Sequence, residues 1–345
     1  MRSLAVWVAG FVLALSFVGL ASAAGAKGSD PIAEAGFVRI GGIDQWISIH
    51  GDHRDDPVLL ILHGGPGMTN APFAPAMEGW RRHFIVVDWD QRGAGRTFGR
   101  NRATGHGEMT FGRLTRDGLE VAEHLRGRLH KRRIAVFGVS AGSVVGLSMV
   151  QARPELFSAY VGSGQFVDGG EADAIAYRRT LERATATGNA EAVKALTELG
   201  PPPWAVAGRG NAVRGWVGRT TPLSDPATRM NVPNMLRALP DYTPADMQDA
   251  LDGFTFSSQA LAAERDRLGV RSLGTRFAVP IYIFQGAGDL NTPTELVARW
   301  FAEIRAPAKK MVVVENASHG AFFTHADQLG ALLAETVAPV ARRAD

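Results

Sequence analysis

Residues 138–142, which read Gly-Val-Ser-Ala-Gly, join a buried strand to a helix. The run 134–137 before them is short and apolar, as in a strand that is buried on both faces of a parallel sheet. Helical spacing of apolar residues begins at Ala141. A strand that turns directly into a helix is the repeating unit of α/β folds. This segment therefore predicts a parallel sheet covered by helices.

Short apolar runs recur along most of the chain and alternate with helical patterns. A hairpin comes first, with strands predicted at 37–40 and 46–50 around the turn Gly41-Gly42. Buried strands follow at 58–62, 84–88, 134–137, 158–161, 281–285 and 311–315, and helices at 114–129, from 141, at 295–304 and at 326–338. This alternation predicts a mostly parallel, doubly wound sheet.

The stretch from 166 to 272 interrupts the alternation. It carries helix-like runs at 172–187 and 246–268 and several prolines, and we predict no strand within it. A helical block between two strands is typical of a lid that is inserted into an α/β core. We therefore expect a core made of residues 24–165 and 273–345, and a helical lid domain at 166–272.

The first residues are typical of a secretory leader. Arg2 precedes an almost uninterrupted apolar stretch from 4 to 20, and Ala21-Ser22-Ala23 supplies the small residues that a signal peptidase reads. We expect residues 1–23 to be a signal peptide and the mature protein to be periplasmic or secreted, with no stable membrane association. The alternative is an uncleaved anchor, because this stretch approaches the roughly 20 residues that span a bilayer.

The composition excludes several classes of function. The chain has no cysteine, which removes disulfides, thiolate metal sites and cysteine nucleophiles. Its 37 Lys and Arg against 34 Asp and Glu give a net charge of +3, which does not favour nucleic-acid binding. The histidine pair His50 and His53 has no third metal ligand at a suitable spacing. We therefore predict no nucleic-acid partner, no metal and no nucleotide cofactor.

Ser140 stands at the centre of the glycine-flanked turn. A strained turn of this kind pushes the serine hydroxyl out above the sheet, where it is suited to attack a carbonyl group. The loop His63-Gly64-Gly65-Pro66-Gly67 follows the strand 58–62, and its glycines let the backbone approach a substrate. We predict that the N–H groups of Gly65 and Ala141 form an oxyanion hole and that Gly64 contacts the substrate. His63 is expected to orient this loop.

A nucleophilic serine needs a base, and the base needs an orienting carboxylate. Asp289 follows the strand 281–285, and His319 follows the strand 311–315. The chain order serine, aspartate, histidine is that of hydrolases with such a turn. We therefore predict a triad of Ser140, His319 and Asp289. The alternatives are His325 for the base and Asp88 or Asp90 for the acid.

These motifs together resemble the proline iminopeptidase family of α/β-hydrolase serine peptidases. The resemblance rests on His63-Gly-Gly-Pro-Gly67, on Asp90-Gln-Arg-Gly-Ala-Gly-Arg96, on the turn at Ser140 and on the loops of Asp289 and His319, and it covers about 37–165 and 275–340. It implies an α/β-hydrolase fold, a Ser-His-Asp mechanism, no cofactor, and release of an N-terminal residue, usually proline, from short peptides. It also implies that residues 90–96 form a buried structural loop, held by Arg92.

The chain departs from this family in the lid. Relatives read the free amine of the substrate with lid carboxylates, and Glu171 and Asp173 stand at the corresponding place. They are our candidate amine ligands, although two carboxylates at the start of a helix are also favoured by its dipole. In addition, Ala141 stands where the family usually has tryptophan, which makes one wall beside the serine smaller.

Three functions remain open from the sequence. The first is an aminopeptidase acting on short peptides. The second is an esterase or lactonase with the same mechanism, whose lid buries an apolar acyl group with the aromatic residues Trp204, Trp216, Phe254 or Phe256. The third is a non-catalytic binding protein, against which the complete triad argues. The sequence leaves the oligomeric state open.

Overall fold

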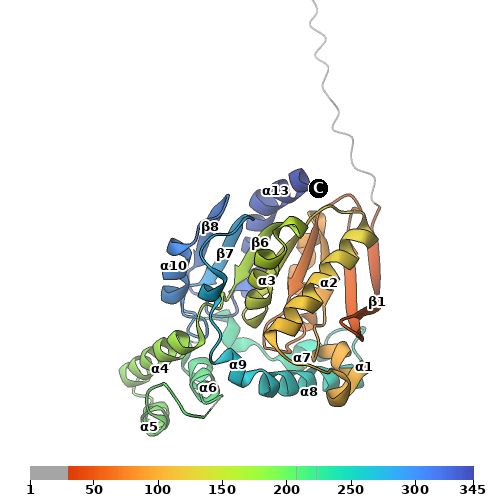
Figure 1. Cartoon of the computed structure of the whole chain (residues 1–345). Helices are drawn as coiled ribbons and strands as arrows, with labels where there is room; N and C mark the ends of the chain where they lie inside the picture. Colours follow the sequence, from red (N-terminus) through yellow and green to blue (C-terminus); the bar gives the residue numbers. More distant parts are fainter. Residues whose placement is uncertain (1–29, 207, 223) are drawn as a thin grey trace, which may run out of the picture.

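The computed structural model describes residues 30–206, 208–222 and 224–345, so the predicted leader at 1–23 lies outside the described residues. Its centre is an eight-stranded sheet with the order β1-β2-β4-β3-β5-β6-β7-β8 (Figure 1). β2 pairs antiparallel with β1 and β4, and the other neighbours are parallel. The strands are β1 (Ile32–Ile40), β2 (Ile43–Gly51), β3 (Val58–Leu62), β4 (Ile85–Trp89), β5 (Ile134–Val139), β6 (Phe157–Ser163), β7 (Ile281–Gly286) and β8 (Lys309–Val314). The predicted α/β class and mostly parallel sheet are confirmed.

The central strand β3 shows why the apolar runs were informative. It coincides with the predicted range, and none of its side chains is more than 1% exposed. Burial on both faces requires helices on both faces, which leaves no position for a polar side chain. The other strands shift or lengthen by one to five residues at their ends.

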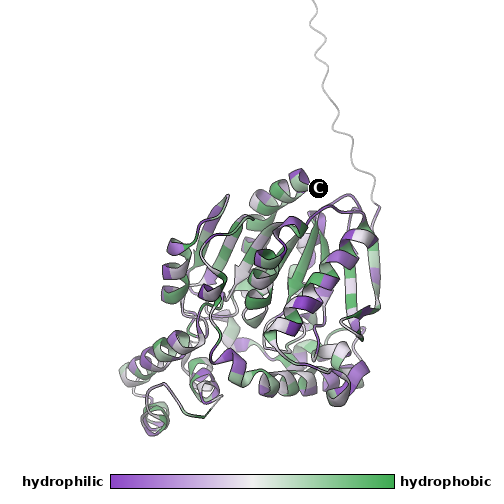
Figure 2. Cartoon of the chain, in the orientation of Figure 1, coloured by the Kyte–Doolittle hydropathy of each residue, from purple (hydrophilic) through white to green (hydrophobic). Residues whose placement is uncertain are grey.

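Helices cover both faces of the sheet (Figures 1 and 2). The apolar side chains of one face pack with Leu125, Val145 and Trp300, and those of the other pack with Trp80 and Leu329. The predicted helix at 326–338 is divided by a short π-helical turn. The elements are α2 (Phe111–Leu129), α3 (Ala141–Ala152), η2 (Pro154–Leu156), α10 (Thr294–Glu303), η1 (Ala71–Arg82), α11 (Ala321–Thr324), α12 (Ala326–Leu332), η5 (Leu333–Val337) and α13 (Ala338–Ala344).

A block of helices lies between β6 and β7 in the chain and beyond one end of the sheet, beside α1 (Gly95–Gly105) (Figure 1). The helix-like run at 246–268 is broken at the buried Leu261, which ends one helix and begins the next. The elements of the block are α4 (Gly169–Ala186), α5 (Ala190–Leu199), α6 (Gly210–Thr220), η3 (Pro226–Arg229), α7 (Val232–Arg237), α8 (Pro244–Ala260) and α9 (Ala262–Arg265), with η4 (Val270–Leu273) after it.

The chain enters and leaves this helical block at one place. Asp168 and Gly269 pair in an isolated antiparallel bridge. Beside it the N–H of Val270 donates a hydrogen bond of 2.8 Å to the carbonyl of Val167. The two ends of the block are therefore held together by backbone hydrogen bonds.

Within the described ranges, no helix is both long enough and apolar enough to cross a membrane.

Candidate active site

Ser140 occupies a sharp turn between the end of β5 and the start of α3. Its φ of 51° and ψ of −118° are unusual for a residue with a side chain. A Cβ atom on Gly142 would lie 2.2 Å from the carbonyl oxygen of Leu62, and one on Gly138 would lie 2.7 Å from the Cα of Ser143. Only glycine fits at these two positions, which is the crowding that the sequence motif predicted.

The turn rests on hydrogen bonds that the sequence analysis missed. The hydroxyl of Ser143 donates a hydrogen bond of 2.5 Å to the carbonyl of Ser140 and accepts one of 2.9 Å from the N–H of Phe166. The side-chain amide of Gln165 also donates to this hydroxyl, at 3.2 Å. A serine among the apolar residues that begin α3 was the available signal. These bonds fix the turn against the loop after β6.

His319 and Asp289 meet at the carboxyl ends of β8 and β7. The Nδ1 atom of His319 lies 2.9 Å from Oδ2 of Asp289. Asp289 is 1% exposed. With Nδ1–H donating to the carboxylate, the Nε2 atom of the ring is free to accept a proton. The structure therefore brings together the predicted base and acid.

Further groups hold Asp289 in place. The hydroxyl of Thr292 donates 2.7 Å and the side-chain amide of Gln285 donates 2.9 Å to Oδ2. The N–H groups of Asn291 and Thr292 donate 2.9 Å and 3.0 Å to Oδ1. Gln285 is fully buried in β7, and a polar residue at the end of an apolar strand was the signal that could have found it. This carboxylate is oriented by four hydrogen bonds besides that of the histidine.

The surroundings of His319 shift its pKa upward. Burial lowers the pKa, but the charge of Asp289 and its hydrogen bond raise it, and the net change from the usual value is a rise. The guanidinium of Arg214 opposes this rise. Gly164 lies against the ring with a φ of +55°, and a Cβ atom there would lie 2.8 Å from Cε1 of His319.

The loop after β3 lies against the serine. A Cβ atom on Gly64 would lie 3.0 Å from the Cβ of Ser140. Among the described residues, the N–H groups of Gly65 and Ala141 have no hydrogen-bond acceptor. Gly64, Gly65, Ser140 and Ala141 all line one cavity, together with His319. Two free N–H groups beside a serine are what an oxyanion hole requires.

His63 holds this loop to the segment that follows β4. Its Nε2 accepts a hydrogen bond of 3.1 Å from the N–H of Gln91, and the Gln91 side chain donates 3.0 Å to the carbonyl of His63. Burial lowers the pKa of His63 to about 4, so the ring is neutral near pH 7. This geometry agrees with the prediction that His63 orients the loop.

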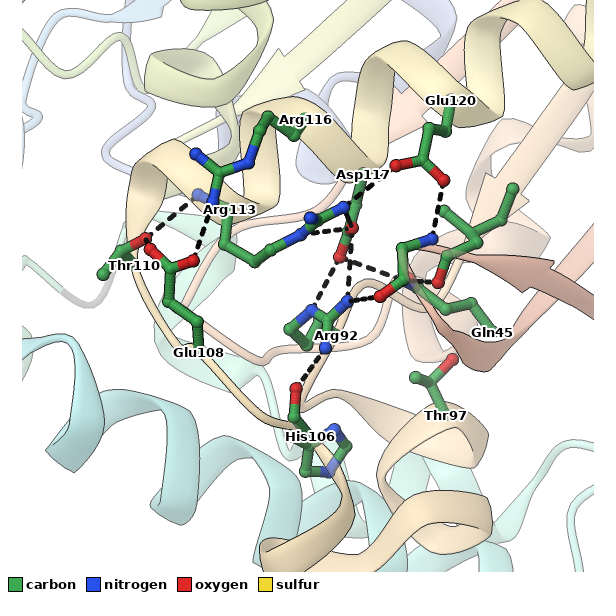
Figure 3. A network of polar contacts seen from close by, with 12 residues as sticks. Gln45, Arg92, Thr97, His106, Glu108, Thr110, Arg113, Arg116, Asp117 and Glu120 are labelled. Atoms are coloured by element: carbon green, nitrogen blue, oxygen red, sulfur yellow. Dashed lines mark hydrogen bonds and ion pairs between the residues drawn. The ribbon is translucent and has the colours of Figure 1, made fainter.

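Arg92 is the centre of a buried network (Figure 3). Its Nε donates 2.7 Å to Asp117, which is fully buried, and its Nη2 donates 2.8 Å to the carbonyl of Gly41. It also donates to the carbonyl of His106. The residues around 90–96 therefore form a buried structural loop held by Arg92, as the resemblance implied.

The cavity in front of Ser140 has a volume of about 400 Å³. Loops of the sheet supply one side of its wall and the helical block supplies the other. Much of the wall is apolar and aromatic, with contributions from Phe73, Phe166, Val217, Phe254, Phe322 and Phe323. A largely apolar cavity of this size with a few polar groups is suited to a small molecule or a short peptide.

Residues 58–332 match the family model described as "Alpha/beta hydrolase family". The chain belongs to this family.

Two proteins similar to this hydrolase carry aminopeptidase names. It is 29% identical over 284 residues to "Probable aminopeptidase YbaC" of Bacillus subtilis, covering 81% of this chain and 88% of the relative. It is 38% identical over 112 residues to "Probable proline iminopeptidase" of Streptomyces coelicolor, covering 30% of this chain and 32% of the relative. The resemblance stated from the motifs is thereby confirmed.

A solved structure shows the same fold. A proline iminopeptidase-related protein from Thermus thermophilus superimposes with a TM-score of 0.61 at 18% identity, over 91% of this chain and 100% of that one. The predicted α/β-hydrolase fold is confirmed for this chain.

The two candidate amine ligands, Asp173 and Glu171, lie in different surroundings. Asp173 is buried, lines the cavity and pairs with Arg214. Glu171 is exposed, does not line the cavity and pairs at 2.9 Å with both Arg271 and Arg299. The prediction for Glu171 therefore needs correction: its place on α4 turns it to the surface, where it joins the block to the core.

The other lid residues and the alternative triad members are also placed. Of the aromatic residues considered for an acyl pocket, Phe254 lines the cavity, whereas Trp204, Trp216 and Phe256 do not. The alternative base and acids do not line the cavity either: His325 bonds to Thr324, Asp88 to Asn70 and Asp90 to Thr69. Sequence reasoning missed Arg214, Arg265 and Asp266, which line the cavity.

Proposed function

We propose that this hydrolase is a serine aminopeptidase that releases an N-terminal residue, proline or one like it, from short peptides. Ser140 is the nucleophile, His319 the base and Asp289 the residue that orients the base. The observation that carries this proposal is the 2.9 Å contact of His319 with Asp289, on a ring that faces the same cavity as Ser140. A nucleophile, a base and an orienting acid are the groups that acyl transfer needs.

The reaction proceeds in two stages. In the first, Nε2 of His319 takes the proton of Ser140 while Oγ bonds to the substrate carbonyl carbon. The carbonyl oxygen becomes an oxyanion held by the N–H groups of Gly65 and Ala141, each worth roughly 3–4 kcal/mol in the transition state. The C–N bond then breaks, and His319 protonates the departing amine. In the second stage His319 takes a proton from water, whose oxygen bonds to the acyl carbon; the bond from that carbon to Oγ then breaks, and His319 returns the proton to Oγ of Ser140.

Asp173 is our candidate ligand for the N-terminal amine of the substrate. It lines the cavity, and its Oδ2 receives no hydrogen bond from any described residue. A carboxylate with a free oxygen can accept a hydrogen bond from an ammonium group. The names of two similar proteins also favour an aminopeptidase.

An esterase is the second candidate, and one observation favours it. Asp173 and Asp266, the carboxylates that line the cavity from the helical block, are paired with Arg214 and Arg265. Their negative charges are therefore compensated before a substrate arrives. The apolar wall that remains would suit an acyl group.

One set of assays separates these candidates. We would measure hydrolysis of proline-naphthylamide, of its N-acetylated form and of a nitrophenyl ester. An aminopeptidase cleaves the first and fails on the second, because the acetylated amine carries no charge for Asp173. Equal rates on the first two, or activity on the ester alone, would favour the esterase. The variant Ser140→Ala should lose activity by about 10⁴-fold or more while remaining folded. An unchanged rate would overturn the assignment of Ser140.

Export of the protein is a separate proposal. We infer from the leader pattern that residues 1–23 are removed and that the enzyme works in the periplasm or outside the cell. Sequencing the N-terminus of protein purified from its native host tests this: a mature chain that begins after Ala23 supports export, and retained Met1 contradicts cleavage.

A further inference from the structure

Charged side chains of the helical block reach the cavity at one place. They are Asp173 on α4, Arg214 on α6, Arg265 on α9 and Asp266 after it. Charges are costly beside an apolar wall unless they are paired or contact a ligand. Which of them already have partners therefore indicates which are available to a substrate.

Arg265 and Asp266 satisfy each other. Nε and Nη2 of Arg265 donate 3.3 Å and 2.8 Å to Oδ1 of Asp266, and its Nη1 donates 3.0 Å to Asn211. Oδ2 of Asp266 accepts 2.7 Å from the N–H of Gly208. All three guanidinium nitrogens of Arg265 are thus engaged, and this pair is a structural part of the wall.

Arg214 is different, because part of its guanidinium has no acceptor. Its Nη1 donates to Asp173. Its Nη2 lies 3.9 Å from Asp266, which is too long for a hydrogen bond, and its Nε makes none with the described residues. Burial lowers the pKa of Arg214, as expected for a cation that is incompletely compensated. A guanidinium has five N–H donors, so several remain unused beside the cavity.

The helix around Arg214 holds this side chain in position. α6 begins at Gly210, where a Cβ atom would lie 2.3 Å from Oδ2 of Asp173. Only glycine lets the helix approach this carboxylate so closely. Arg214 follows one turn later and therefore lies on the same face of α6, against Asp173. The carboxylate fixes the guanidinium before a substrate binds, which reduces the entropy lost on binding.

The charge of Arg214 also affects the pKa of His319. It opposes the rise that Asp289 produces in the pKa of His319. Arg214 and Ser140 line the same cavity of about 400 Å³. When the carbonyl group of a substrate lies at Ser140, another group of the same substrate can therefore reach the guanidinium of Arg214.

We propose that Arg214 binds a carboxylate of the substrate and so makes the enzyme prefer short substrates with a free carboxylate group. The planar guanidinium matches a carboxylate in a two-pronged contact. This carboxylate comes from the C-terminus of a di- or tripeptide or from an acidic side chain. The inference rests on the proposed hydrolysis at Ser140 and adds to it the class of substrate.

Two pairs of substrates test the proposal and separate the two sources. The first pair is prolyl-alanine and prolyl-alaninamide, which differ in the C-terminal carboxylate. The second is glutamyl-naphthylamide and glutaminyl-naphthylamide, which differ in the side chain. We expect the wild-type enzyme to prefer the carboxylate in one pair by about 10- to 100-fold in kcat/KM, mainly through KM. No preference in either pair, or a preference for the amides, would overturn the proposal.

Variants then assign the preference to Arg214. Arg214→Gln should abolish it, and Arg214→Lys should retain part, because an ammonium keeps the charge but not the two-pronged geometry. The matched control is Arg219→Gln, which removes a positive charge from the same helix at a residue that does not line the cavity. The control should keep the preference. A preference that survives in a folded Arg214→Gln would overturn the role of Arg214.

The outcome stays separable from the proposed function. Hydrolysis of proline-naphthylamide by the wild-type enzyme and its loss in Ser140→Ala concern the reaction alone. If these hold and neither substrate pair discriminates, the proposal for Arg214 fails and the serine mechanism stands. If Arg214→Gln does not fold, the wild-type comparison and Arg214→Lys still decide the matter.

Discussion

Oδ2 of Asp289 lies 2.9 Å from Nδ1 of His319 and is also held by Thr292 and Gln285. Asp289→Asn keeps the shape of this site but switches the tautomer of His319. An amide N–H in place of the carboxylate needs an acceptor at Nδ1, so the proton of the ring moves to Nε2, which can then no longer accept the serine proton. We expect kcat to fall by about 10⁴-fold. We also expect some loss of stability, because the new amide N–H faces the side-chain amide of Gln285, which donates to Oδ2 in the wild type. Steady-state kinetics and a thermal melt check this. A loss of less than tenfold would show that Asp289 is not the orienting acid.

The profile of activity against pH should have an acid limb whose midpoint lies above the ordinary pKa of histidine. His319 must be neutral to accept the serine proton, and its net pKa shift is upward from 6.5. Activity therefore falls as pH drops through a midpoint above 6.5. The measurement is kcat/KM against pH with proline-naphthylamide, which carries no carboxylate.

Two variants should move that midpoint in opposite directions. Arg214→Gln removes a cation that lowers the pKa of His319, so the midpoint should rise. Asp289→Asn removes the charge that raises it and leaves the effect of burial, so the midpoint of the residual activity should fall below 6.5. Identical profiles for the wild type and both variants would contradict the assignment of His319 as the base.

Gly164→Ala should impair catalysis more than folding. The new methyl group would lie 2.8 Å from Cε1 of His319, so the ring must move. A displacement of about 1 Å in a catalytic group can cost on the order of 100-fold in rate. Gly188→Ala is the matched control, since Gly188 also has a positive φ, of +67°, but has no neighbouring atom within 4 Å. Both variants should lose similar stability from backbone strain, and only Gly164→Ala should lose kcat.

Arg92→Ala should destabilise the fold. It would remove one of the two guanidinium partners of the fully buried Asp117, which keeps Arg113 and Gln45, and it would leave two backbone carbonyls without donors (Figure 3). Each buried acceptor that is left without its donor typically costs about 1–3 kcal/mol of unfolding free energy. Urea denaturation measures this change. Arg116→Ala, which removes an exposed pair with Glu108, should alter the midpoint little.

The sequence predicted what local patterns determine. Gly138 is required by contact with Ser143 in the same turn, and Gly142 by contact with the end of β3. These glycines, and the burial of β3 on both faces, each leave a readable pattern in the sequence. The loops of Asp289 and His319 follow from the places where two strands end. Chain order then favoured Asp289 over Asp90, and the helix that starts at His325 favoured His319 as the base.

The cavity wall from the helical block could not be predicted in the same way. Glu171 and Asp173 are two residues apart at the start of one helix, and nothing in their spacing says which one turns inward. The inward orientation of Asp173 depends on Arg214, which lies 41 residues later in the chain. The packing of α6 against α4 brings the two residues together. Partners that come from tertiary packing leave no local pattern in the sequence.

The bridge between Asp168 and Gly269 has an evolutionary consequence. The two ends of the helical block are joined there by backbone hydrogen bonds, so the block forms a closed loop on the sheet. The number of residues inside such a loop can change at little cost to the sheet. Insertions, deletions or recombination inside the block can reshape the wall opposite Ser140 without altering the register of the strands. Selection for new substrates can therefore act on one exchangeable module while the reacting groups are inherited unchanged.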